Sequence, residues 1–132
     1  MTDSIFQEFK NFKVLLVGNP RAKFEAIQAI RSSLDSQGNS ISFEQPDRLP
    51  VVELAKSTYD VAVSGFIKPT FIVHPDEVFA KLIQSLKANG KLYLVEPICS
   101  ESIQGLPFRT SEELVKLVKV IFFLLYSLFF IL

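Results

Sequence analysis

The sequence is poor in the side chains that build metal centres and disulfides, with a single cysteine, Cys99, and a single histidine, His74. A disulfide within the chain needs two cysteines, and sites for zinc or an iron–sulfur cluster normally use three or four Cys or His ligands. The composition therefore excludes an internal disulfide and a multi-thiolate metal or cluster site within this chain. It also fits a reducing compartment.

An excess of charge of either sign is also lacking, because fourteen Lys and Arg residues balance fourteen Asp and Glu residues. Binding to nucleic acid requires clustered basic side chains that displace counterions from phosphates, and the sequence contains no such cluster. We therefore expect no nucleic-acid partner. Residues 1–13 have no unbroken apolar stretch of the kind found in a secretory signal, so we expect a cytoplasmic location.

The length of 132 residues and the apolar content of 48% fit one compact domain with one hydrophobic core. We assign residues 1–119 to an α/β domain and residues 120–132 to an apolar C-terminal tail. There is no room for a second domain.

Short β-branched and leucine-rich runs predict the strands, and longer segments with apolar residues at helical spacing separate most of them. The expected strands are residues 13–17, 41–44, 59–64 and 91–95. Because strands alternate with helices through short connections, the sequence predicts βαβ units and a mainly parallel sheet. The expected fold class is α/β, a Rossmann-like, three-layer fold of the S-adenosylmethionine methyltransferase type whose C-terminal strands are incomplete.

Capping signals set the expected helix boundaries. Asn19 and Pro20 predict the N-cap and first residue of one helix, which Gly38 closes. We expect a short helical segment at residues 51–57, and a second long helix that starts at Pro75 and ends at Gly90. The last helix is expected to start after Thr110, which is spaced from Glu113 as a capping box.

Glycine is scarce where a nucleotide-binding fold needs it most, in the loop after the first strand. This loop reads VGNPRAK and offers only Gly18, whereas a nucleotide or S-adenosylmethionine site needs several glycines so that the backbone can approach the ligand. Pro20 removes one N–H donor, and Arg21 and Lys23 add bulk where a ligand would lie. We therefore expect an ordinary strand-to-helix turn.

The remaining polar candidates do not combine into an active site in the sequence. Glu44 falls where an acidic side chain receives ribose hydroxyls in nucleotide-binding folds, although a solvated glutamate is the commoner case. His74 has no nucleophile nearby in sequence and precedes Pro75 at a helix start, Glu96 ends a strand before Pro97, and Cys99 is a lone thiol. We expect no catalytic, cofactor-binding or metal-binding residue.

The segment from Tyr59 to Pro97 is similar to the second half of class I methyltransferase folds, through YDVAVSGF, the helix VFAKLIQSLKANG and the strand KLYLVEP. More closely, it resembles the N-terminal methyltransferase-like domain of the anamorsin family of cytosolic iron–sulfur assembly factors. The shared features are Ser64-Gly65, His74, the leucine-rich helix, Gly90 and Glu96-Pro97.

This resemblance implies a non-catalytic interaction domain that works with an NADPH-dependent diflavin reductase. It also implies that the cofactor pocket is missing and that the family's cluster-binding cysteines lie in a separate C-terminal region, so no cofactor is expected on this chain. A divergent S-adenosylmethionine-dependent methyltransferase using Gly18 and Glu44 is the enzymatic alternative.

The apolar tail, VIFFLLYSLFFIL, carries no charge. As a helix, its thirteen residues would span about 20 Å, which is short of a hydrocarbon core of about 30 Å. Counted from Leu114 to Leu132, the stretch approaches the lower limit for spanning, so a tail-anchored membrane protein is a further alternative. Two other interpretations of the tail are a final buried helix or strand, and an aberrant or alternatively spliced C-terminus. We prefer the aberrant or alternatively spliced C-terminus.

Overall fold

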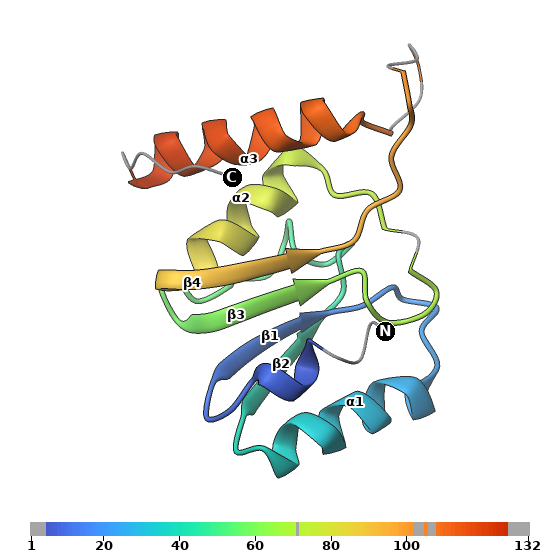
Figure 1. Ribbon diagram of the computed structural model, residues 1–132, viewed down its shortest axis with the longest axis vertical. Helices are drawn as coiled ribbons and strands as arrows, with labels where there is room; N and C mark the ends of the chain where they lie inside the picture. Colours follow the sequence, from blue (N-terminus) through green and yellow to red (C-terminus); the bar gives the residue numbers. More distant parts are fainter. Residues whose placement is uncertain (1–4, 71, 102–104, 106–107, 127–132) are drawn as a thin grey trace.

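The structure is a computed structural model that describes residues 5–70, 72–101, 105 and 108–126, with side chains described only as far as Val120 in the last helix (Figure 1). These residues form an alternating series of strands and helices after a short 3-10 helix. The elements are η2 (Phe6–Glu8), β1 (Lys13–Val17), α1 (Phe24–Ser36), β2 (Ser40–Glu44), β3 (Tyr59–Ser64), α2 (Asp76–Ser85), β4 (Leu86–Leu94) and α3 (Ser111–Tyr126).

The four strands form one sheet in the order β2-β1-β3-β4, and every neighbouring pair is parallel. Both α1 and α2 lie between consecutive parallel strands, as a βαβ arrangement requires. The predicted α/β class and the Rossmann-like, methyltransferase-type parallel sheet are therefore confirmed.

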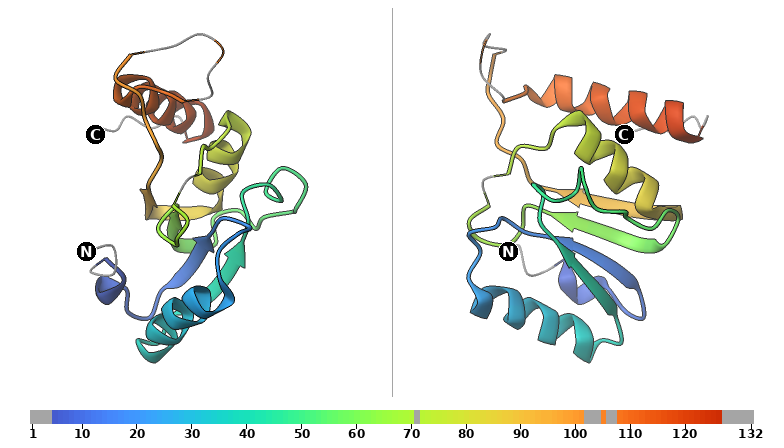
Figure 2. Two further views of the ribbon diagram at one scale, coloured as in Figure 1. Left: turned by 90° about the vertical axis from the view of Figure 1, so that its right-hand side faces the viewer. Right: turned by 180° about the vertical axis from the view of Figure 1, so that it is seen from behind.

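Helices cover both faces of the sheet in three layers (Figure 2). On one face, α1 and η2 pack over a cluster that includes Val14, Leu16 and Val61. On the other face, α2 packs over Leu15 and Ala62. Since consecutive residues of β1 enter opposite clusters and are fully buried, the run KVLLV forms a central strand with two apolar faces.

The first helix starts later than predicted. α1 begins at Phe24 with Lys23 as its N-cap residue, so the expected start at Asn19 and Pro20 is wrong. The Asn19 side-chain oxygen instead accepts a hydrogen bond from the Arg21 N–H at 2.9 Å, and its carbonyl accepts one from the Ala22 N–H. This Asx-type turn uses the groups that a helix N-cap would have used.

The expected short helix at residues 51–57 is also wrong, because turns, a bend and irregular chain occupy this stretch. Ser57 has a φ of 51°, outside the right-handed helical region. The Lys81 ammonium donates to the carbonyl oxygens of Leu49 and Val52, at 2.6 and 3.0 Å. Buried Leu49 and these two hydrogen bonds fix the segment against α2 without a helix.

The helix α2 is shorter than predicted and does not reach Gly90. It ends at Ser85, and Gly90 lies inside β4. The reason is Leu86, which adopts an extended conformation, pairs with Tyr59 of β3 and is buried in the core. Tertiary packing of Leu86 therefore overrides the helical periodicity that placed this residue in the helix.

The capping box that predicted the last helix is present. The Glu113 N–H donates to Thr110 Oγ1 at 3.1 Å, and the Thr110 N–H donates to Glu113 Oε1 at 2.9 Å. The helix α3 continues past residue 120, and residues 127–132 of the predicted tail lie outside the described part. Within the described part, no helix is both long enough and apolar enough to cross a membrane.

Candidate functional site

The polar site of this protein lies where β3 and β4 end side by side. Gly65 follows β3 with a φ of 91°, a conformation that side chains other than glycine rarely adopt. A Cβ atom at this position would lie 2.2 Å from the carbonyl oxygen of Val95. Glycine therefore allows the ends of the two strands to approach closely, and this approach brings Ser64 and Glu96 to the same place.

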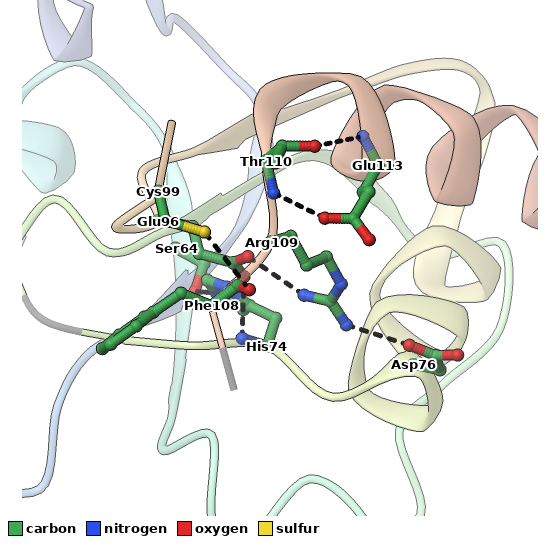
Figure 3. Close-up of polar contacts among 9 residues, drawn as sticks. All are labelled: Ser64, His74, Asp76, Glu96, Cys99, Phe108, Arg109, Thr110 and Glu113. Atoms are coloured by element: carbon green, nitrogen blue, oxygen red, sulfur yellow. Dashed lines mark hydrogen bonds and ion pairs between the residues drawn. The ribbon is translucent and has the colours of Figure 1, made fainter. Parts of the chain in front are cut away.

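Three side chains form a hydrogen-bonded chain at this point (Figure 3). Ser64 Oγ lies 2.6 Å from His74 Nε2, and His74 Nδ1 lies 2.8 Å from Glu96 Oε1. The His74 backbone N–H also donates to Glu96 Oε1, at 2.8 Å. Because a carboxylate can only accept, Nδ1 carries a proton, and in the neutral ring Nε2 accepts the Ser64 hydroxyl proton.

Arg109 completes the network from the segment that leads into α3. Its guanidinium donates to Glu96 Oε2 at 3.0 Å and to the carboxylate of Asp76, the first residue of α2, at 2.9 Å. It also lies over the ring of Phe79, 5.6 Å from the ring centroid, which is within range of a cation–π interaction. The network therefore connects β3, the start of α2, the end of β4 and the start of α3.

The charge state of Glu96 follows from these contacts. Burial raises the pKa of this carboxyl, but the hydrogen bonds from the His74 ring and backbone outweigh it, with help from electrostatic attraction to His74 and to the Arg109 guanidinium. The net result is a pKa below the ordinary 4.5. Glu96 is thus an anion at neutral pH, although its side chain is fully buried.

The order Ser, His, Glu is also that of a hydrolase triad, in which histidine takes the proton of a serine nucleophile. Here the side chains of His74 and Glu96 are fully buried, and Ser64 has no exposed surface. A substrate carbonyl could not reach Ser64 Oγ without opening the fold. The arrangement is therefore suited to holding chain segments together and does not present a nucleophile in this structure.

The Gly18 loop lies at the other position where a Rossmann-like fold would hold a ligand, the end of β1. A Cβ atom added to Gly18 would lie 3.0 Å from the Phe43 ring and 3.2 Å from the end of Ile67. The protein's own side chains thus fill the space against the loop. This contact is a further obstacle to ligand binding at the loop. The sequence already suggested three others, namely the single glycine, Pro20 and the basic side chains.

Glu44 and Asp60 lie apart from this network, whereas the Cys99 backbone N–H donates to the Arg109 carbonyl oxygen at 3.0 Å. Glu44 ends β2 and lies 3.8 Å from Arg48, with one fifth of its side chain exposed. Asp60 accepts a hydrogen bond from the Lys13 N–H at 2.8 Å, so it connects the starts of β3 and β1. Cys99 is a free, half-buried thiol whose Sγ lies 3.7 Å from the Phe108 carbonyl oxygen. Within the described residues, no group of three or more His, Cys, Asp or Glu residues could hold a metal ion.

The sequence did not reveal that Ser64, His74 and Glu96 meet. Sequence reasoning places His74 at a helix start with no nucleophile nearby and Glu96 at the end of a strand, because the three residues are distant in sequence. One signal was present: Ser64 ends one predicted strand, Glu96 follows another, and the ends of neighbouring parallel strands lie at the same edge of a sheet. The order of the strands, which the sequence alone does not give, makes β3 and β4 neighbours.

The fold and the filled loop define a methyltransferase-like α/β domain with a buried polar network where its third and fourth strands end. The profile of the family described as "Anamorsin, N-terminal" matches residues 11–124, and the chain belongs to this family. An anamorsin homolog from Monosiga brevicollis is 40% identical over 93 residues, which are 67% of this chain and 33% of that protein.

Two further anamorsin homologs extend this similarity. The one from Nematostella vectensis is 31% identical over 113 residues, 83% of this chain and 38% of that protein. The one from Branchiostoma floridae is 31% identical over 104 residues, 76% of this chain and 33% of that protein. The matched stretches thus span about a third of the length of these relatives.

Proposed function

We propose that this chain is a non-catalytic interaction domain in cytosolic iron–sulfur protein assembly, and that it works with an NADPH-dependent diflavin reductase. Family membership supports the role in assembly. The observation that carries the non-catalytic assignment is the packing of Phe43 and Ile67 against Gly18, because side chains this close to the loop backbone hinder the close approach of a nucleoside to it.

The buried network supports the same proposal from a second position. Ser64, His74 and Glu96 satisfy one another inside the fold, and none of the three side chains reaches solvent. A catalytic group must touch its substrate, whereas a structural group does not. We assign these residues to the stability of the domain, which then offers its outer surface to protein partners.

Iron–sulfur clusters are proposed to bind outside this chain. Cluster sites normally need several thiolates, and Cys99 is the only cysteine in the sequence. The matched stretch covers about a third of each relative, so the cluster chemistry of the family is assigned to the remaining length. The role of this domain is then to position the assembly factor on its reductase.

Isothermal titration calorimetry with S-adenosylmethionine tests the non-catalytic part. We expect no heat of binding for the natural chain, and binding in the micromolar range would contradict the proposal in favour of the methyltransferase alternative. A chain with Leu54→Ala, a half-buried residue of the opposite sheet face away from the Gly18 loop, serves as a control for non-specific heats.

Calorimetry with a purified NADPH-dependent diflavin reductase tests the partner. The full-length Nematostella vectensis relative is the positive reference, and we expect this chain to bind the same reductase. Binding of the reductase by the relative but not by this chain would place the contact outside the matched stretch and would refute this part of the proposal.

A further inference from the structure

An asparagine–glycine pair lies at the surface of β4, in a part of the strand that does not pair regularly. The register of β4 against β3 shifts between Tyr59 and Val61, and residues 87–90 have no partner in this register. Extra residues of this kind bulge out of a strand and disrupt the ladder locally. Asn89 is exposed and has a φ of 66°, and Gly90 follows it. Both residues also line a groove of about 260 Å³, so water reaches them.

The pair has a chemical consequence, because asparagine is a thermally labile residue. The backbone nitrogen of the residue that follows attacks the side-chain carbonyl carbon, a carbon–nitrogen bond forms, and ammonia leaves. Water then opens the cyclic imide and leaves aspartate or isoaspartate. The attacking nitrogen must lose its proton, and a side chain on its own residue hinders closure of the ring. Glycine therefore favours the reaction, because it has no Cβ and its backbone is the most permissive.

At two of the other three asparagines, the sequence or the fold hinders this reaction. Asn19 precedes Pro20, whose nitrogen carries no proton. Asn39 is only 4% exposed, and its side-chain amide donates to two backbone carbonyl oxygens. The nitrogen that would attack it is held as well, since the Ser40 N–H donates to the Phe12 carbonyl oxygen at 2.8 Å.

The remaining asparagine, Asn11, is the natural comparison for Asn89. It is also exposed, and its φ of 58° lies in the same left-handed region. It differs in the residue that follows, because Phe12 carries a large side chain and its N–H donates to Asn39 Oδ1 at 2.9 Å. Ring closure at Asn11 has to break this hydrogen bond and pass the aromatic ring. Exposure and backbone conformation are thus matched, while the attacking nitrogen differs.

We propose that Asn89 is a deamidation site, at which the Gly90 nitrogen displaces ammonia and water opens the resulting imide to aspartate or isoaspartate. The only co-reactant is water, and no partner or cofactor takes part. The bulge supports the proposal because residues outside the regular ladder open locally at low cost in free energy. This inference does not depend on the proposed function.

Deamidation changes the charge of the bulge and leaves the regular pairing in place. It adds one carboxylate to a stretch that already carries Lys87, whose side chain is 45% exposed and whose ammonium lies 3.5 Å from Asp60. Isoaspartate also adds one carbon atom to the backbone. Because residues 87–90 lie outside the register, the pairing from Lys91 onward does not have to change. We therefore expect the modified chain to stay folded.

Peptide mapping by mass spectrometry tests the proposal on the full 132-residue chain. The chain is kept at neutral and at mildly alkaline pH and is then digested with pepsin at acidic pH, where the reaction does not continue. We expect Asn89 to convert at least about tenfold faster than Asn11, which corresponds to about 1.4 kcal/mol of activation free energy. The rate should rise with pH, and in water labelled with heavy oxygen the new carboxylate should contain one oxygen atom from the solvent.

The matched variant is Asn89→Gln, because the longer side chain closes the ring far less readily. It should remove the early conversion of the β4 peptide and leave the slow conversion at Asn11 unchanged. Its circular dichroism spectrum should match that of the natural chain, since Asn89 is exposed.

Three outcomes would overturn the proposal. One is a natural chain in which Asn89 stays intact. Another is conversion of Asn89 and Asn11 at equal rates. The third is a product that contains aspartate but no isoaspartate, since direct hydrolysis of the side-chain amide would then replace the attack by the Gly90 nitrogen.

Discussion

Replacing Glu96 by alanine gives the most direct test of the buried network. The carboxylate accepts three hydrogen bonds, two from His74 at 2.8 Å and one from Arg109 at 3.0 Å. A hydrogen bond to a charged group contributes about 1.5–3 kcal/mol, and a buried donor that loses its acceptor incurs the full cost of desolvation.

The two donors of His74 dominate the estimate, because His74 is fully buried and neither donor has another acceptor in the described contacts. Arg109 contributes less, since its side chain is 17% exposed and keeps Asp76 as a partner. We therefore expect Glu96→Ala to lower the free energy of unfolding by about 3–5 kcal/mol, the range for breaking a buried charged pair. That is a large share of the 5–15 kcal/mol that is typical of a whole domain.

Urea unfolding followed by circular dichroism measures the change. Glu96→Gln is the second variant in case the alanine chain does not fold, because the amide oxygen can still accept from His74, and we expect a smaller loss of about 1–3 kcal/mol. Exposed Glu101→Ala is the matched control and should change stability by less than about 0.5 kcal/mol. A loss below about 1 kcal/mol in Glu96→Ala would show that the network does not stabilise the fold.

Three further predictions follow from the same region. The pKa of Glu96 is lower in the folded chain than its ordinary value, so the ionised carboxylate stabilises the fold above pH 4.5, and this stabilisation is lost as the pH falls through the folded pKa. Urea unfolding midpoints measured across this pH range should therefore fall less steeply with decreasing pH in Glu96→Gln than in the natural chain. Gly65→Ala should destabilise by more than about 2 kcal/mol, because the new Cβ would meet the Val95 carbonyl oxygen. Gly105→Ala has a similar φ of 87°, but among the described residues no atom lies within 4 Å of its new Cβ, so it should cost only about 1 kcal/mol. Equal losses in thermal unfolding would remove the role assigned to strand contact. Thr110→Ala should cost about 1 kcal/mol by removing the cap of α3, and an unchanged melting temperature would contradict this.

The fold could be predicted from the sequence because its signals are local. Runs that are mostly apolar, such as Lys13–Val17, become parallel strands, and the spacing of Thr110 and Glu113 gives a capping box at the predicted position. The errors at residues 51–57 and at Gly90 have a different cause. In both places, contacts with distant parts of the chain, through Lys81 and Leu86, outweigh local propensity.

The candidate site could not be predicted in the same way, because it depends on which strands are neighbours. Ser64, His74 and Glu96 lie ten and twenty-two residues apart along the chain. Each has an ordinary local explanation as a strand end or a helix start. Only the pairing of β3 with β4 and the close approach at Gly65 bring their polar atoms within 2.8 Å of one another.

At the carboxyl edge of the sheet, where a Rossmann-like enzyme binds its ligand, the protein's own side chains pack at two strand ends in two chemically different ways. Against Gly18, Phe43 and Ile67 provide apolar contact. At the end of β3, the side chains of Ser64, His74 and Glu96 provide polar contact without exposed atoms. Both contacts support the proposal of an interaction domain over that of a divergent methyltransferase, because each places the protein's own side chains where a ligand of this fold type lies.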